Sequence, residues 1–235
     1  MELHFLGSGS AFYPQYKNTS AYFELNNDLY LIDCGETVFE TLLSLVDLEQ
    51  YREIYVVITH LHADHVGSLA SLISYTYCML DKKHVTVIHP KPTIAQLLSL
   101  MGIGREFYRY KEAYDGSSVE FEAIQVQHVD NMECFGYVIK VNGEKVYYSG
   151  DSSHLPQRIL EDFRKGEIKI IYHDTSTHDS DYATHCYYGK LEAWIPHEMR
   201  KRVFCMHLDS DCKDLLEGKG FSVVSVDGDS YAEPR

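Results

Sequence analysis

The chain of 235 residues lacks several features that would assign it to a protein class at once. It contains no apolar run of about 18 residues, so no membrane span is expected. Its six cysteines form no Cys-x-x-Cys pair and a core of this size needs no cross-links, so we expect free thiols and a cytoplasmic protein. No short repeat, low-complexity tract or linker interrupts it, which predicts a single domain over residues 1–235.

Positive charge is also scarce. The chain has 21 Lys and Arg residues against 35 Asp and Glu residues, which gives a formal net charge of −14. Affinity for nucleic acids comes largely from cations that neutralise phosphates, so a long nucleic acid is not an expected partner. A small anion is compatible with this charge if bound divalent cations hold it.

The most informative segment is the one that ends in His60-Leu-His62-Ala-Asp64-His65. These four potential metal ligands follow directly after a run of strand-forming residues, so they are expected at the edge of a sheet. Imidazoles and carboxylates suit Zn²⁺ or a similar divalent ion, with Mn²⁺ as an alternative. His60 and His62 can reach one ion while Asp64 and His65 turn towards a second. This layout predicts a binuclear site, in which two ions about 3.5–4 Å apart activate one water molecule.

Two metal sites need further donors, and the sequence offers candidates at other strand ends. His128 and His207 come directly after strand-like runs, Asp151 follows another run after Gly150, and Asp33 ends a fourth. Because the first cluster needs further ligands, we predict that His128, Asp151 and His207 complete the ligand set. Asp33 is predicted to orient a ligand rather than to bind metal itself.

The pattern of apolar residues predicts an α+β fold. Strands are expected at 2–6, 20–25, 29–33, 54–58, 84–88, 119–127, 135–141, 145–149, 168–172, 202–206 and 221–226. Helices are expected at 36–48, 66–80, 92–101, 156–164 and 186–200. The helix at 66–80 would begin right after the first ligand cluster and direct its N-terminal dipole at the metal loop. The stretch 102–116 is expected to be a surface loop or a cap over the site. Strands and helices in both halves favour two sheets with helices outside.

These residues also resemble a known family. The segment Thr59–His65, followed in order by His128, Ser149-Gly-Asp151 and His207 and preceded by Asp33, resembles the metallo-β-lactamase superfamily. Three further segments resemble its ribonuclease Z-like phosphodiesterase branch; they are Phe5-Leu-Gly-Ser-Gly-Ser-Ala-Phe12, Tyr172-His-Asp-Thr175 and Ala183-Thr-His185. The resemblance covers nearly the whole chain. It implies an αββα sandwich, with two mixed β-sheets flanked by helices.

The resemblance also implies roles for the site residues. One zinc would be held by His60, His62 and His128, the other by Asp64, His65 and His207, with Asp151 bridging them. Asp64 would also orient or deprotonate the nucleophile. His185, stabilised as an imidazolium by Asp174, would protonate the leaving alkoxide. His173 would stand behind the site together with Asp33.

Two departures from the branch narrow the expected function. Asp174 stands where the branch has Glu, which shortens its reach by one methylene group. Only 22 residues separate His128 from Asp151, so the long arm with which transfer-RNA-processing members clamp their substrate is missing. A compact phosphodiesterase without this arm is similar to the anti-Pycsar cyclic nucleotide phosphodiesterases. That similarity implies a homodimer that hydrolyses 3′,5′-cyclic mononucleotides, including cyclic CMP and cyclic UMP, and so counteracts cyclic nucleotide immune signalling in a host–virus interaction.

Other functions stay open at this point. They are a ribonuclease Z-like endoribonuclease that processes transfer RNA 3′ ends, a thioester or lactam hydrolase, and a metal-bound regulatory module without catalysis. The base-binding residues are open as well. Tyr187 and Tyr188 could stack on a nucleobase or pack a helix, and the cationic and aromatic residues of 105–111 could close over a nucleotide or form a solvated face.

Overall fold

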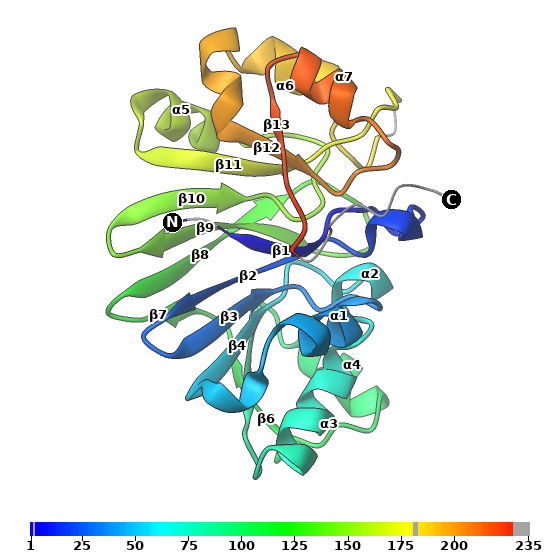
Figure 1. The fold of residues 1–235 in the computed structure, drawn as a ribbon, viewed down its shortest axis with the longest axis vertical. Coiled ribbons are helices and arrows are strands. Elements are labelled where there is room, and N and C mark those ends of the chain that lie inside the picture. Colours follow the sequence, from blue (N-terminus) through cyan, green and yellow to red (C-terminus); the bar gives the residue numbers. More distant parts are fainter. Residues whose placement is uncertain (2, 181–182, 228–235) are drawn as a thin grey trace.

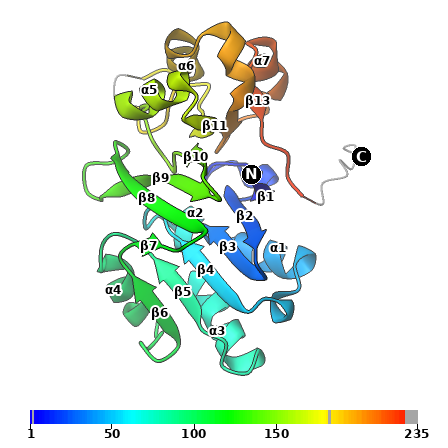
Figure 2. The same cartoon turned by 90° about the vertical axis from the view of Figure 1, so that its left-hand side faces the viewer.

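The structure is a computed structural model that describes residues 1, 3–180 and 183–227. Two mixed β-sheets pack face to face, and helices cover their outer faces (Figures 1 and 2). The first sheet has the order β1-β2-β3-β4-β5-β6, and the second has the order β13-β12-β11-β10-β9-β8-β7. This arrangement confirms the predicted sandwich. None of the described helices is long and apolar enough to cross a membrane.

Most of the strands overlap the expected runs, and β6 and β7 are the exceptions. The first sheet contains β1 (His4–Gly7), β2 (Ser20–Leu25), β3 (Asp28–Ile32), β4 (Glu53–Val57), β5 (Val85–Ile88) and β6 (Tyr108–Lys111). The second contains β7 (Tyr114–Asp115), β8 (Val119–Val126), β9 (Cys134–Val141), β10 (Glu144–Tyr148), β11 (Ile168–Asp174), β12 (Val203–Met206) and β13 (Ser222–Val223). β3 is buried along its whole length because it lies between β2 and β4 under a layer of helices. This explains why its sequence is an almost unbroken apolar run.

The helices form two outer layers. α1 (Val38–Leu45), α2 (Ala63–Val66), α3 (Leu69–Met79) and α4 (Thr93–Leu100) belong to the first half of the chain. α5 (Gln157–Lys165), α6 (Tyr188–Trp194) and α7 (Lys213–Gly218) belong to the second half. Short 3₁₀ helices lie at Pro14–Tyr16, Leu48–Gln50 and His197–Arg202. α5 shows how such a helix is encoded: Ile159, Leu160 and Phe163 form its buried face, and Gly166, with φ of 77°, ends it in the left-handed conformation.

Three apolar cores hold the four layers together. One lies between the first sheet and its helices and includes Leu31, Ile54 and Leu72, while a second fills the space between the sheets and includes Tyr137 and Tyr148. A third joins the second sheet to α5, α6 and α7. Each fully buried aliphatic side chain stabilises the fold by roughly 1.5–3 kcal/mol relative to an exposed one. The cores therefore fix the two sheets against each other, and this docking determines where their edges meet.

The stretch 102–116 corrects one prediction. Instead of a loop or cap, it contains β6, which pairs in parallel with β5, and β7, which pairs antiparallel with β8. It thus carries the chain from one sheet to the other. Tyr108 is buried in the helix-side core while its neighbour Arg109 is exposed, an alternation typical of an edge strand. The cavity at the ligand cluster is not lined by these residues.

Two predicted helices are also interrupted. The helix expected to begin after His65 is divided into α2 and α3 at Gly67 and Ser68, so Asp64 and His65 lie inside a short helix rather than in a loop before one. At the break, the Ser68 hydroxyl donates to the carbonyl of Gly35 and accepts from the Phe39 amide, which holds this position against the start of α1 and the segment before it. The helix expected at 186–200 ends at Trp194, before a 3₁₀ helix that begins after Pro196. α7 is not among the helices expected from the sequence.

The topology places the ends of the central strands at one edge of the sandwich. β3 and β4 run in parallel in the first sheet, and β10, β11 and β12 run in parallel in the second. Their carboxyl ends therefore point the same way within each sheet. Figure 1 shows both groups of strand ends directed to the side on which α2 lies.

Candidate metal centre

All seven predicted metal ligands come together at this edge. They form two groups whose ligand atoms lie within 4.8 Å of one another, and both groups contain Asp151. The first group is His60, His62, His128 and Asp151; the second is Asp64, His65, Asp151 and His207. Only His62 among these side chains is partly exposed, so the cluster is closed to bulk water on most sides.

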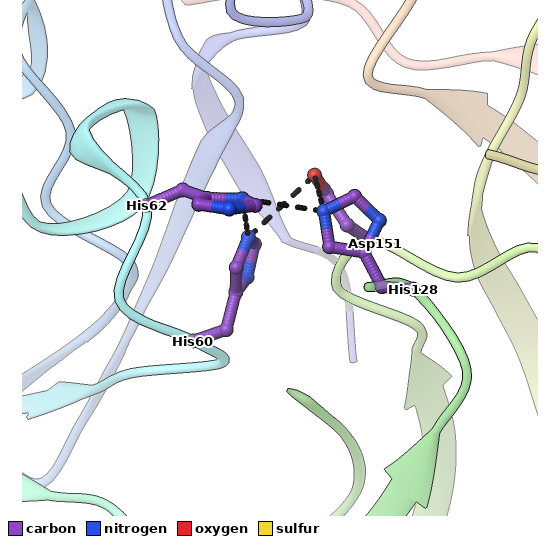
Figure 3. A group of neighbouring side chains, drawn as sticks. All are labelled: His60, His62, His128 and Asp151. Carbon is purple, nitrogen blue, oxygen red and sulfur yellow. Dashed lines mark hydrogen bonds and ion pairs between the residues drawn. The ribbon is translucent and has the colours of Figure 1, made fainter. Parts of the chain in front are cut away.

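The first group surrounds a point between four donor atoms (Figure 3). Nδ1 of His62 lies 2.9 Å from Nε2 of His60 and 3.2 Å from Nε2 of His128. Oδ2 of Asp151 lies 3.7 Å from Nε2 of His60 and 3.6 Å from Nε2 of His128. The dashed lines in Figure 3 join these atoms, which point inward from three separate segments of the chain.

The second group uses the other oxygen of the shared carboxylate. Oδ1 of Asp151 lies 3.2 Å from Nε2 of His65 and 3.3 Å from Nε2 of His207. Oδ2 of Asp64 lies 3.3 Å from each of these two nitrogens. Asp151 therefore directs one oxygen to each group, an arrangement that would let its carboxylate bridge two ions.

The donor set fits divalent metal ions. Ligand atoms about 2.1 Å from a tetrahedral ion are roughly 3.4 Å apart, which is close to the separations in both groups. Nε2 of His65 and Oδ1 of Asp151 are buried and have no hydrogen-bond partner among the described residues, although they face each other. Buried polar atoms without a partner are costly, and a bound cation would satisfy both. Imidazole nitrogens and carboxylate oxygens are ligands that suit zinc and related ions.

Electrostatics favour positive charge between these side chains. Burial would raise the pKa of Asp151, but His207, His65 and His60 hold it well below its usual range. Burial would lower the pKa of His207, but Asp151, Asp174 and Asp64 raise it to about 10. The pKa of His60 is lowered, first by burial and then by the charge of His65. The carboxylates thus stay ionised and attract either protons or metal ions to the second group.

Asp33 supports the cluster from behind. It is fully buried, and its Oδ1 accepts the backbone N–H of Thr59 at 2.8 Å while its Oδ2 accepts the Thr59 hydroxyl at 2.8 Å. Nδ1 of His65 lies 2.8 Å from the same Oδ2, so its proton points to Asp33 and Nε2 is left to face the second group. A Cβ on Gly35 would overlap the carbonyl oxygen of Asp64, which shows how closely the two segments pack. Asp33 therefore fixes the tautomer and orientation of His65.

A carboxylate–histidine pair stands beside the ligands. Nδ1 of His185 lies 2.8 Å from Oδ2 of Asp174, so the shorter Asp side chain still reaches it. Oδ1 of Asp174 lies 3.5 Å from Nδ1 of His207. The His185 side chain is 34% exposed, while Asp174 is fully buried and its Oδ2 also accepts the backbone N–H of Ser152. Burial would lower the pKa of His185, but the charge of Asp174 outweighs it and raises the pKa above its usual value.

A cavity of about 640 Å³ opens over this constellation. Its lining includes Asp64, His128, Asp151, His185 and His207 from the site. The remaining lining residues include Ser10, Ala11, Phe12, Glu36, Val129, Ser176, Thr184 and Asp209. This volume is typical of a pocket for a small molecule. A second, more open hollow of about 890 Å³, lined in part by Leu61 and Gln127, adjoins it at Val129.

Comparison with known proteins assigns the chain to a family. A sequence model described as "Anti-Pycsar protein Apyc1" matches residues 1–103 and 105–231. The chain belongs to this family. The Apyc1 protein of Bacillus phage 010DV004 is 25% identical over 98% of both chains, and that of Paenibacillus xerothermodurans is 25% identical over 94% of this chain and 92% of its own. Ribonuclease Z of Methanococcus maripaludis is 26% identical over 72% of this chain and 55% of its own.

Solved structures share the fold. The human tRNase Z short form covers 97% of both chains with a TM-score of 0.71 and 18% identity. A diphosphatase of the PhnP family covers 95% of this chain and 94% of its own with a TM-score of 0.72 and 19% identity. The predicted relation to the metallo-β-lactamase fold is therefore confirmed. Together with the two ligand groups, membership of the Apyc1 family also confirms that the chain is a metal-dependent phosphodiesterase.

Some of the predicted residues lie apart from the centre of this Apyc1-family site. Nδ1 of His173 donates to the backbone carbonyl of Asp174 at 2.7 Å, so the ring satisfies a backbone acceptor next to the site. Tyr187 and Tyr188 contact each other, with ring centroids 4.7 Å apart, and neither lines the cavity. Two residues within the recognised motifs have roles that the sequence did not indicate. Thr59 links Asp33 to the ligand loop, and Phe12, a large aromatic residue in a Gly- and Ser-rich turn, lines the cavity.

Asp33→Ala should lower metal affinity by about 10- to 100-fold, because His65 would lose the contact that orients it. The measurement is a zinc titration of the metal-free protein in competition with a chelating dye. Asp28→Ala is the matched control, since Asp28 is buried at the other end of β3 and pairs with Arg52. Asp28→Ala should reduce thermal stability and leave metal affinity intact. Equal metal affinities in the two variants would contradict the role of Asp33.

Proposed function

We propose that this Apyc1-family protein hydrolyses 3′,5′-cyclic mononucleotides, cyclic CMP and cyclic UMP included, to nucleoside monophosphates. The observation that carries the proposal is the juxtaposition of two ligand groups, which share Asp151, with the Asp174–His185 pair in one small cavity. Such an arrangement combines a place for a phosphate with a proton donor for the leaving oxygen. In a cell, this activity would remove a cyclic nucleotide immune signal.

We propose two zinc ions per chain. His60, His62 and His128 would hold one ion and Asp64, His65 and His207 the other, with Asp151 between them. Ions held there would supply hydroxide at neutral pH and would neutralise charge on the phosphate. Oδ2 of Asp64 faces two imidazoles and its carboxylate lines the cavity, so it is placed to orient the attacking water.

The residues that would move the proton are His185 and Asp174. With Nδ1 of His185 directed at Asp174, Nε2 is the nitrogen that is free to donate. As the P–O bond of the ring breaks, the leaving ribose oxygen would take this proton, and the imidazolium would become neutral imidazole. Asp174 holds the ring in place and stabilises its charged form until then.

Size and charge support a small substrate. A cyclic mononucleotide carries a single negative charge, which the site can neutralise locally. A transfer RNA would place many phosphates against a surface with a net charge of −14.

Two further properties belong to the proposal. Five of the six cysteines are buried free thiols, which supports a cytoplasmic location. We propose a homodimer as the assembly.

The metal proposal has a direct test. Elemental analysis after zinc loading should give about two ions per chain. His62→Ala should abolish turnover while leaving a folded protein, because partly exposed His62 supplies a donor to the first group and little to the core. One ion or none in the wild-type protein would contradict the binuclear arrangement.

The substrate proposal is tested with a panel. The zinc-loaded protein is incubated with cyclic mononucleotides, cyclic dinucleotides and a precursor transfer RNA, and the products are separated by chromatography. We expect hydrolysis of the cyclic mononucleotides and negligible cleavage of the RNA. Efficient, salt-sensitive cleavage at the transfer RNA 3′ end, with cyclic CMP and cyclic UMP untouched, would favour the endoribonuclease instead.

His185→Ala should lower kcat on cyclic nucleotides by roughly 10²–10⁴-fold, because the alkoxide would leave without a proton. The loss should be much smaller on bis(4-nitrophenyl) phosphate, since nitrophenolate is a stable anion. His84→Ala serves as the control, because His84 lies before β5, at the end of the strand remote from the site. An equal loss on both substrates would remove His185 from the acid role.

A further inference from the structure

One large aromatic side chain stands open in the cavity over the ligand groups. Phe12 is 96% exposed, more than any other large apolar residue in the described chain, and it shares the cavity lining with His62, Asp151 and His185. The next most exposed, Leu100, lies at the end of α4 and does not line this cavity. Exposed apolar surface is therefore present in the cavity that opens over the ligand groups.

The fold gives no reason for an aromatic residue at this position. The Tyr13 N–H donates to the Ser10 carbonyl at 3.1 Å and closes a turn with Ala11 and Phe12 at its centre. Central turn positions favour small or polar residues such as Gly, Asn and Asp. Almost none of the Phe12 side chain is buried, so it adds little to the stability of the core.

The turn is held firmly against the segment that carries a candidate ligand. The Ser10 N–H donates to the carbonyl of Leu208 at 2.9 Å, and the Leu208 N–H donates to the carbonyl of Ser8 at 2.8 Å. Leu208 directly follows His207. On the far side of the turn, the Tyr16 hydroxyl donates to Asp211 at 2.9 Å. The backbone bearing Phe12 is thus fixed relative to the second ligand group.

Gly9 makes this close packing possible. A Cβ at Gly9 would lie 2.6 Å from the carbonyl oxygen of Tyr13 and 2.9 Å from that of Lys17. Only glycine lets the two legs of the loop approach in this way. The turn is therefore tight and preorganised, and a ligand that binds against Phe12 would not have to order a flexible loop.

We propose that Phe12 is the surface on which the nucleobase of the substrate stacks, an inference that rests on the proposed function. With the phosphate at the ligand groups, the base is the flat and weakly polar part of a cyclic nucleotide. Aromatic side chains bind bases of every type by stacking, since each base has a π-face. Stacking reads no hydrogen-bonding edge, so the enzyme should accept purine and pyrimidine cyclic nucleotides alike. Phe12, rather than Tyr187 or Tyr188, would then be the aromatic residue that stacks on the base.

The test compares substrates with and without a base. Phe12→Ala should raise KM for cyclic CMP and cyclic AMP by roughly 10- to 100-fold and change kcat little, because stacking adds binding without touching the reacting atoms. KM for the abasic analogue, 1-deoxyribose 3′,5′-cyclic phosphate, should not change. Phe12→Trp should keep KM for the nucleotides low. Leu100→Ala, the matched exposed apolar control, should behave like the wild-type protein, and the melting temperature of Phe12→Ala should be unaltered.

Several outcomes would overturn the inference. An unchanged KM for cyclic nucleotides in Phe12→Ala, or an equal rise for the abasic analogue, would show that Phe12 does not contact the base. A rise in KM with Gln127→Ala instead would place the base in the adjoining hollow. A change in oligomeric state without a change in KM would make Phe12 an interface residue. If the wild-type protein turns over neither type of substrate, the proposed function fails together with this inference; normal wild-type turnover with an unaffected Phe12→Ala overturns this inference alone.

Discussion

The rest of the structure depends on the concentration of buried carboxylates at one edge of the sandwich. Asp33, Asp64, Asp151 and Asp174 are all buried, and each contacts at least one imidazole. A buried carboxylate without compensation costs several kcal/mol, so this edge is stable only with positive charge among its side chains. Protonated histidines can supply that charge, and divalent ions can replace the protons. The same electrostatic requirement therefore stabilises the edge and creates its affinity for metal.

This requirement ties the function to the docking of the two sheets. Asp64 and His207 are 143 residues apart in sequence, yet their side chains lie 3.3 Å apart. Asp151 contacts ligands from both halves of the chain. His65 comes after β4 of the first sheet, and His207 comes after β12 of the second. The core between the sheets, together with backbone hydrogen bonds such as those between Leu208 and Ser8 and Ser10, holds these segments at that distance. A change that loosens this core would disturb the ligand groups even without touching a ligand.

Three kinds of surface line the cavity: the ligand groups, His185 of the Asp174–His185 pair and the apolar side chain of Phe12. In the proposed function, the ligand groups at the base of the cavity would bind the phosphate, and the partly exposed His185 beside them, paired with Asp174, would donate the proton. Phe12 adds an apolar wall from a turn that is pinned to the segment after His207. A cyclic nucleotide has the same division into a charged ring, a leaving oxygen and a flat base. The net charge of −14 over the rest of the chain disfavours longer polyanions.

By itself, the sequence determined the features that depend on neighbouring residues. The ligand cluster after β4 and the strand-end positions of His128, Asp151 and His207 could be read from local runs, and the family resemblance supplied their expected grouping. The tertiary structure decided the rest. Only the packing of the sheets turns one oxygen of Asp151 to each group, makes edge strands of β6 and β7 in the 102–116 stretch and opens the cavity beside Phe12. Local periodicity fixes strands and helices, whereas these contacts join segments that are far apart in the chain and form only when the cores assemble.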